Sequence, residues 1–401
     1  MEGTRHAELL TCDGNDTQWS LCFSPLDYFR RVVMPYHANR LRPLTRAELE
    51  VLSPLKATRE NLRVTAKSIW STTYVTVPPG VELAPKVKSE RVDVRPDGQS
   101  LWKIGVEMSA GSTPGLPMGC TVQRHEKTDT MGQISGHPSF RPEWMDVRFI
   151  PKTGIRRPQP QMRDGKGRKV KPLTVFPGDA RQVLFDTSWP WLLTGKIVTS
   201  DGTSGSGVLI GDRLVLTARH VMPWNSIGTG NWWMKFTPYY FDGTEPFGSS
   251  YVSDARHYGT DDTDFNLSHD YAVLRLYEPL GNRLGYIGTT SFDDGWRGLN
   301  VWENVGYPFD VAGGERPAVQ SWQSFEDDYE DDDGQTLETE ASLNHGNSGG
   351  PFFAWFENGS QVRACGVVSS EVSFDGDADN SVSGGDNLVN LVDWARANWP
   401  L

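Results

Sequence analysis

Short apolar runs separated by turn residues fill the second half of the chain, from about Gly178 onward. Residues 208–210 and 213–216 are apolar runs on either side of Gly211-Asp212, which predicts a hairpin with a two-residue turn. Four further runs predict strands in the same way: residues 271–276, 300–305, 352–356 and 362–368. Many short strands with glycine-rich turns are typical of antiparallel sandwiches and barrels.

The last stretch of the chain has a different period. Residues 386–399 predict a helix, because apolar positions recur with helical spacing along one face. That face contains Leu388, Leu391, Val392 and Ala395. The pattern over residues 178–401 therefore predicts an all-β domain that ends in one helix.

The first 150 residues form a mixed and poorly defined region. Thr45-Arg46-Ala47-Glu48 fits a capping box, which predicts a short helix that Pro54 ends. Residues 59–70 predict a second helix from a weak period, and residues 71–77 alternate as a strand does. Residues 151–177 contain eight basic residues, one acid and several Pro and Gly, so we expect an exposed linker.

Charge divides the chain more sharply than its net value of −12 suggests. Residues 1–180 carry a net +8 and residues 181–401 a net −20. We therefore expect the halves to attract each other. No base-stacking or groove-reading motif accompanies the basic half, so we expect no nucleic-acid partner.

Composition excludes several other classes. No stretch approaches the roughly 20 apolar residues of a membrane span, so we expect a soluble protein without a membrane partner. The charged start, residues 1–8, lacks the apolar core of a secretory signal, and the compartment stays open. The four cysteines are too scattered for a disulfide scaffold or a zinc site, and we expect no cofactor and no metal.

Three local patterns carry the candidate chemistry. His220 ends an apolar strand in Thr217-Ala218-Arg219-His220, and Asp270 opens the strand at 271–276. Ser348 lies inside the glycine-rich turn Gly346-Asn347-Ser348-Gly349-Gly350-Pro351. Acyl transfer by a serine needs an imidazole that takes its proton and a carboxylate that fixes the imidazole tautomer. It also needs backbone N–H groups that face the developing oxyanion, which neighbouring glycines permit.

In the chain order His, Asp, Ser, these patterns resemble the chymotrypsin-like serine proteases. Among these, the closer resemblance is to the glutamyl endopeptidases and related trypsin-like peptidases of microbes. Three further segments resemble that group: residues 179–183 its mature start, residues 305–308 its Gly-Tyr-Pro motif, and residues 365–369 the strand beside its specificity pocket. The resemblance covers about residues 178–401.

The resemblance implies two six-stranded antiparallel β-barrels with a C-terminal helix, and a serine endopeptidase that acts on proteins or peptides. It implies Ser348 as nucleophile, His220 as general base and Asp270 as its orienting carboxylate. The backbone N–H groups of Gly346 and Ser348 would form the oxyanion hole, and Ser369 would bond near Asp270. Residues 1–150 would then be a pro-segment or an accessory region that contacts the protease domain, residues 178–401, as in a zymogen.

The turn around the nucleophile and the specificity pocket both depart from the family pattern. Asn347 stands where digestive proteases carry an aspartate that pairs with a freed N-terminus, so activation must work differently. In the specificity pocket, Val368 and Leu343 replace the polar residues with which glutamyl endopeptidases recognise glutamate, and Ser342 occupies the pocket base. His345 could supply a donor instead. A small or apolar preference is therefore as well supported as a glutamate preference.

Several acidic residues have ordinary interpretations. Asp261, Asp262 and Asp264 are expected in a solvated loop, as is the acidic run 326–333. Residues 375–386 match four calcium-loop positions but lack the loop glycine, so no calcium site is predicted. The alternative function is a non-catalytic protein-binding module on a protease fold, against which the complete Ser, His and Asp set argues.

Overall fold

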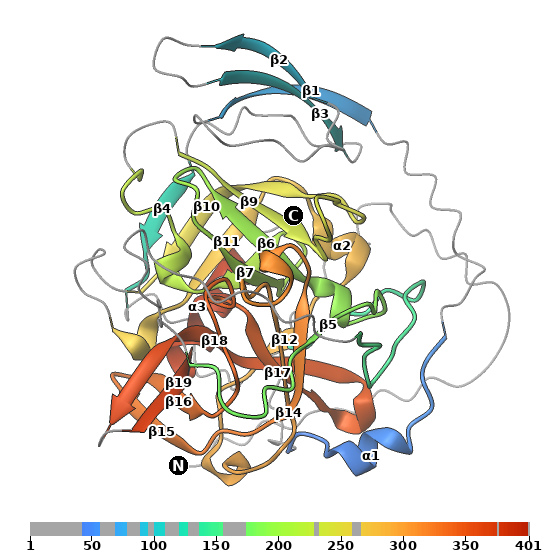
Figure 1. The fold of residues 1–401 in the computed structure, drawn as a ribbon, viewed down its shortest axis with the longest axis vertical. Helices are drawn as coiled ribbons and strands as arrows, with labels where there is room; N and C mark the ends of the chain where they lie inside the picture. The colour runs from blue at the N-terminus through green and yellow to red at the C-terminus, as the bar shows by residue number, and fades with distance from the viewer. Residues whose placement is uncertain are drawn as a thin grey trace, which may run out of the picture. The chain divides into compact units, whose positions relative to one another are not determined.

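Two β units make up most of the described chain (Figure 1). The computed structural model describes residues 42–56, 69–77, 89–94, 100–108, 120–126, 136–154, 174–227, 232–258, 266–374 and 377–399. The first unit is a closed barrel with strand order β11-β8-β7-β6-β9-β10, closed by the pairing of β10 with β11. Its strands are β6 (Thr194–Thr199), β7 (Ser204–Leu209), β8 (Leu214–Thr217), β9 (Met234–Pro238), β10 (Ser250–His257) and β11 (Ala272–Leu276).

The second unit is a nine-stranded sheet with the order β15-β16-β19-β18-β17-β13-β14-β5, with β12 on β18. Its strands are β5 (Gln182–Val183), β12 (Gly288–Thr289), β13 (Trp302–Gly306), β14 (Ala318–Gln323), β15 (Asp327–Asp331), β16 (Gly334–Thr339), β17 (Pro351–Phe356), β18 (Gln361–Phe374) and β19 (Asp377–Gly384). The predicted all-β fold is confirmed, and its second unit has more strands than the six expected.

Helices are few and short in the described part. The α-helices are α1 (Arg46–Glu50), α2 (Leu280–Leu284) and α3 (Asp386–Asn398). The 3-10 helices are η4 (Trp191–Leu193), η5 (Arg219–Val221), η6 (Leu267–His269), η7 (Asp294–Trp296), η8 (Ala312–Gly314) and η9 (Glu357–Gly359). The predicted C-terminal helix and the Thr45 capping box are confirmed by α3 and α1. None of the described helices is long and apolar enough to cross a membrane.

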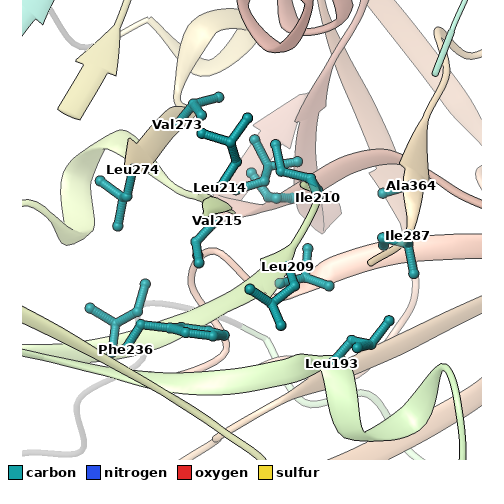
Figure 2. Packing of buried hydrophobic residues seen from close by; sticks show 14 of the residues in the cluster. Leu193, Leu209, Ile210, Leu214, Val215, Phe236, Val273, Leu274, Ile287 and Ala364 are labelled. Carbon is teal, nitrogen blue, oxygen red and sulfur yellow. The ribbon is translucent and has the colours of Figure 1, made fainter. Parts of the chain in front are cut away.

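Buried aliphatic and aromatic side chains fill the barrel. Figure 2 shows Leu209 of β7, Val215 of β8, Phe236 of β9 and Leu274 of β11 in one buried cluster, with Val273 on the opposite face of β11. All five side chains are fully buried. Removal of this much apolar surface from water is the main stabilising contribution to the fold.

Segments that precede residue 178 belong to the same hydrophobic core. Leu49 of α1, Val147 and Phe149 are buried in one cluster with Trp355 of β17. In addition, β4 (Thr121–Arg124) pairs in parallel with β10. A separate three-stranded sheet, with the order β1-β3-β2, contains β1 (Ile69–Val77), β2 (Ser89–Val94) and β3 (Ser100–Met108).

Three local predictions need correction. The acidic run 326–333 is not a loop, because its residues 327–331 form the edge strand β15 on β16. The first hairpin has a four-residue connection, since β7 ends at Leu209 and β8 begins at Leu214. The helix expected at 59–70 is wrong at its end, where Ile69 and Trp70 belong to β1, and residues 59–68 lie outside the described residues, as do Asp261, Asp262 and Asp264.

Candidate active site

Two neighbouring barrel strands bring His220 and Asp270 together. His220 lies in η5, directly after β8, and Asp270 lies between η6 and β11. Because β8 and β11 are antiparallel, with Thr217 opposite Ala272, the end of one strand meets the start of the other. The two residues are 50 positions apart in the chain, yet the strand register places them side by side.

Asp270 holds His220 through two hydrogen bonds. Its Oδ1 accepts from the His220 backbone N–H at 2.9 Å, and its Oδ2 lies 2.6 Å from His220 Nδ1. A third bond comes from the Ser369 hydroxyl, which donates to Oδ2 at 2.6 Å. A carboxylate can only accept, so Nδ1 carries the proton and Nε2 is left as the basic nitrogen.

Burial and charge oppose each other at His220. Burial lowers the pKa of the imidazole, but the Asp270 carboxylate raises it by more, so the pKa lies above its ordinary value. Nearby His345 has a pKa below its ordinary value, because burial and the charge of His220 both disfavour its cation. The Asp270 side chain is fully buried, whereas the His220 side chain is one-third exposed.

Ser348 lies on the loop between β16 and β17, which is bound to both β units. Its carbonyl oxygen accepts from Ser206 N of β7 at 2.8 Å, and Gly349 N donates to Val368 O of β18 at 2.8 Å. A side chain at Gly205 would meet both Val221 and the Ser348 carbonyl oxygen. Ser348 therefore lies at the part of β7 that also contacts η5, which contains His220.

Two glycines allow this loop its close approach. Gly346 has a φ of +90° and Gly349 a φ of +81°, a region that favours glycine. A Cβ on Gly346 would lie 2.2 Å from the Tyr307 carbonyl oxygen, and one on Gly349 would lie 2.2 Å from Thr217 Oγ1. A larger residue at Gly349 would push the loop away from β8, which leads to His220, and one at Gly346 would push it away from the segment after β13.

Three buried side chains brace the turn before Ser348. Ser206 Oγ donates to Gly346 O at 2.6 Å and accepts from Tyr307 N at 2.9 Å. Asn347 Nδ2 donates to Asn304 Oδ1 at 3.1 Å. The amide of Asn347 is thus paired with a neutral partner on β13.

The predicted pocket residues lie on two adjacent segments. Ser342 and Leu343 lie on the loop after β16, and Val368 and Ser369 lie on β18. Leu343 and Val368 are fully buried, and Ser342 is almost so. His345 is half-buried on the same loop, and its carbonyl oxygen accepts from Phe309 N at 2.8 Å.

Sequence reasoning missed several residues that support this site. They are Thr174, Arg181, Ser206, Asn304 and Asn380. Each contacts a partner more than 40 positions away, so no local pattern signals it. Gly205-Ser206-Gly207 is the one local hint, because small residues in a strand often mark a close approach of another backbone.

No metal site is evident in the described part of the chain. No group of three or more His, Cys, Asp or Glu side chains there could hold an ion. Asp375 of the calcium-like run lies outside the described residues, and Asp377 and Asp379 lie on β19. Asp386, the last residue of that run, accepts a hydrogen bond from Ser291.

The barrel and the second sheet define a chymotrypsin-like fold, in which Asp270 is bonded to His220 and the Ser348 loop is bonded to both β units. The family model described as trypsin matches residues 182–395, which is more than half of the chain. The chain therefore belongs to the trypsin family.

Individual relatives cover smaller parts or are more distant. A glutamyl endopeptidase of Bacillus licheniformis is 30% identical over 146 residues, which are 36% of this chain and 43% of that protein. The chain thus matches less than half of that relative's length. A solved Glu endopeptidase is 21% identical, with a TM-score of 0.46 over 56% of this chain and all of the other. The protease Anisep of Arthrobacter nicotinovorans is 20% identical, with a TM-score of 0.40 over 54% of this chain and 99% of the other.

Proposed function

We propose that the protein is a serine endopeptidase that hydrolyses peptide bonds through Ser348, His220 and Asp270. The single observation that carries the proposal is the Asp270–His220 pair beside the Ser348 loop in a chain of the trypsin family. The bond that His220 Nδ1 donates to Asp270 leaves His220 Nε2 as a base, as this chemistry requires.

In the proposed reaction, Ser348 Oγ attacks the carbonyl carbon of the scissile bond while His220 Nε2 takes its proton. The Gly346 and Ser348 N–H groups stabilise the oxyanion; within the described residues neither donates to a protein acceptor. The C–N bond then breaks, and the leaving amine takes the proton from His220. Water, deprotonated by His220, hydrolyses the acyl-enzyme and regenerates Ser348.

We propose further that the pocket does not favour glutamate strongly. Leu343 and Val368 are apolar and fully buried where polar recognition would be needed. Burial and the charge of His220 lower the pKa of His345, which disfavours the cationic form that would attract a carboxylate. Burial of a carboxylate without donors is costly, by about 2 kcal/mol or more.

The test is labelling of the whole protein by a fluorophosphonate, with the modified residue located by mass spectrometry. We expect one label, on Ser348, and none in Ser348→Ala; peptide turnover should fall by about 10⁴- to 10⁶-fold in that variant. Ser370→Ala is a control on the neighbouring strand and should label normally. A protein that neither labels nor cleaves peptides would be a binding module on a protease fold.

A further inference from the structure

Residues 174–181, here called the upstream strap, precede the trypsin-family match and bind the loop that carries Ser348 at both of its flanks. Their first anchor is Thr174. Its N–H donates to Asn380 Oδ1 at 2.9 Å, and its carbonyl oxygen accepts from Asn380 Nδ2 at 2.7 Å and from Leu343 N at 3.0 Å. Asn380 is completely buried and also binds the Ala341 carbonyl oxygen at 2.7 Å.

The next contact reaches the base of the predicted pocket. Phe176 N donates to Ser342 Oγ at 3.1 Å. The strap therefore binds Ser342 and Leu343, the two pocket residues on the loop. These bonds restrain the pocket side of the loop.

The second anchor is Arg181, whose side chain is 1% exposed. Its guanidinium binds Asp179 through Nε at 3.0 Å and Nη2 at 2.8 Å, and binds Asp310 through Nη1 at 2.9 Å and Nη2 at 2.5 Å. Arginine holds two carboxylates in this way because its fork of donors is planar and rigid.

Asp310 links Arg181 to the part of the loop that contains Gly346, whose N–H we assign to the oxyanion hole. It follows Phe309, whose N–H bonds the His345 carbonyl oxygen, and Tyr307, whose carbonyl oxygen lies against Gly346. Arg181 therefore restrains the residues that precede Ser348 indirectly, through Asp310 and the residues before it. The two anchors restrain opposite sides of one loop.

We propose that the upstream strap holds the pocket and the turn at residues 346–348 in their active arrangement in the uncleaved chain. Arg181 and Asn380 are the positioning residues. This proposal rests on the proposed function. The alternative route, an ion pair between a freed N-terminus and an aspartate before the nucleophile, is closed here, because Asn347 is neutral and bonded to Asn304. The intact chain is therefore competent without the creation of a new N-terminus.

The experiment uses the full chain, with its mass of 44.7 kDa verified before and after each assay. We measure the fluorophosphonate labelling rate, kcat and KM for wild type, Arg181→Lys and Asn380→Asp. Arg181→Lys keeps the charge but loses the bidentate bonds, so labelling and kcat should fall about 10- to 100-fold with a smaller change in KM. Asn380→Asp loses the donor to Thr174 and should mainly raise KM.

Matched controls separate positioning from general damage. Arg316→Lys disrupts an exposed pairing with Asp242, and Asn398→Asp makes the same change at the end of α3. Both should leave all three parameters within about twofold. Thermal unfolding identifies variants that fail to fold.

The remaining outcomes test the role of the strap and the proposed function separately. If the intact wild type labels only after cleavage near residue 181, the strap is inhibitory and this inference is wrong, while the proposed function stands. Equal parameters for Arg181→Lys and Arg316→Lys would also overturn the inference. Absence of labelling at Ser348 in every form, cleaved or intact, would overturn the proposed function itself.

Discussion

Asp270 makes three hydrogen bonds, and these set the protonation of the proposed base. The carboxylate accepts two of them from His220 and one from Ser369, so both of its oxygens are hydrogen-bonded although the side chain is buried. A buried charge is tolerated when its bonds are satisfied in this way. The consequence is a His220 imidazole that holds its proton more strongly than usual.

The pH dependence of turnover tests this pairing. A general base works only when neutral, so kcat/KM should rise with pH through a pKa above the ordinary value of about 6.5. In Asp270→Asn the carboxylate that raises the pKa of His220 is lost but the effect of burial remains, so the limb of the pH profile in which kcat/KM rises should move to lower pH. The rate should fall about 10⁴-fold, as in a related triad. Asp254→Asn, which affects a barrel carboxylate paired with Arg275, is the control and should leave the limb in place. An unchanged limb in Asp270→Asn would contradict the assignment.

The same residues predict a metal-independent reaction. The proposed catalysis uses the side chains of Ser348, His220 and Asp270 and the backbone N–H groups of Gly346 and Ser348, and no step needs a Lewis acid. Treatment with EDTA should leave the peptide-hydrolysis rate within about twofold. Loss of turnover that calcium restores would point instead to a structural ion, for which the acidic run 375–386 is the candidate.

At the scale of the elements, β18 and the loop after β16 determine the proposed pocket. Val368 pairs its backbone with the Ser348 loop, and its side chain belongs to the same buried cluster as Leu343 of that loop. We expect proteome digests to show cleavage after small or apolar residues at least as often as after glutamate. Val368→Thr replaces a methyl group with a hydroxyl that can donate a hydrogen bond to a carboxylate, and should increase the share of glutamate sites. A wild-type preference dominated by glutamate would show that the pocket alignment is wrong, and would make His345 the candidate donor.

Strand β13 contains a carboxyl group that the proposed chemistry does not use. Glu303 is completely buried, and burial raises its pKa to about 8; the nearby polar groups of Ser321 and Trp322 and the charge of Arg46 act in the opposite direction. In the unfolded chain the group ionises near pH 4.3. The folded state therefore binds the extra proton between these values, and stability should fall as pH rises from about 4.3 to about 8.

Glu303→Gln should remove this dependence. The free energy of unfolding of the parent should fall between pH 5 and pH 8 by on the order of 3 kcal/mol more than that of the variant. The measurement is urea denaturation at both pH values in a Ser348→Ala background, which prevents self-digestion. Glu326→Gln, at an exposed position, should follow the parent at both pH values. Parallel pH dependence in Glu303→Gln and the parent would refute the prediction.

At the scale of the whole molecule, the question is whether residues before 178 are removable. The described residues from 42 onward belong to one compact unit. Leu44 N donates to Trp355 O at 2.7 Å, and β4 adds to the barrel strand β10. The buried Leu49 lies in the same cluster as the barrel core. These contacts favour a retained accessory region over a pro-segment that departs after cleavage.

Cleavage and mutation can both test this retention. A specific protease site placed between residues 160 and 170 of Ser348→Ala should yield two fragments that elute together without denaturant. Leu49→Ala should lower the free energy of unfolding by about 2–5 kcal/mol, whereas Val51→Ala, at an 82% exposed position, should change it by less than about 0.5 kcal/mol. Separation of the fragments, with a stable and active product of about 24 kDa, would support the pro-segment instead.

The fold class and the candidate chemical groups can be predicted from local patterns along the chain. Strands of the barrel, the α3 helix and the capping box of α1 follow from spacing within a few residues, which alternation and capping signals record directly. The turn around Ser348 and the strand ends at His220 and Asp270 were also evident, because glycine and apolar residues near each position reflect local backbone needs. The acidic strand β15 was missed because its ladder partner β16, rather than its own composition, holds it extended.

The long-range contacts that hold the proposed site in place become visible only in the folded protein. Arg181 meets Asp310 across 129 positions and Asn380 meets Thr174 across 206, and neither pairing leaves a periodic trace in the sequence. The same holds for the segments before residue 178, whose charge predicted attraction but not burial in a shared core. Long-range contacts depend on how separate elements pack, so their chemistry becomes readable only when the fold brings the partners together.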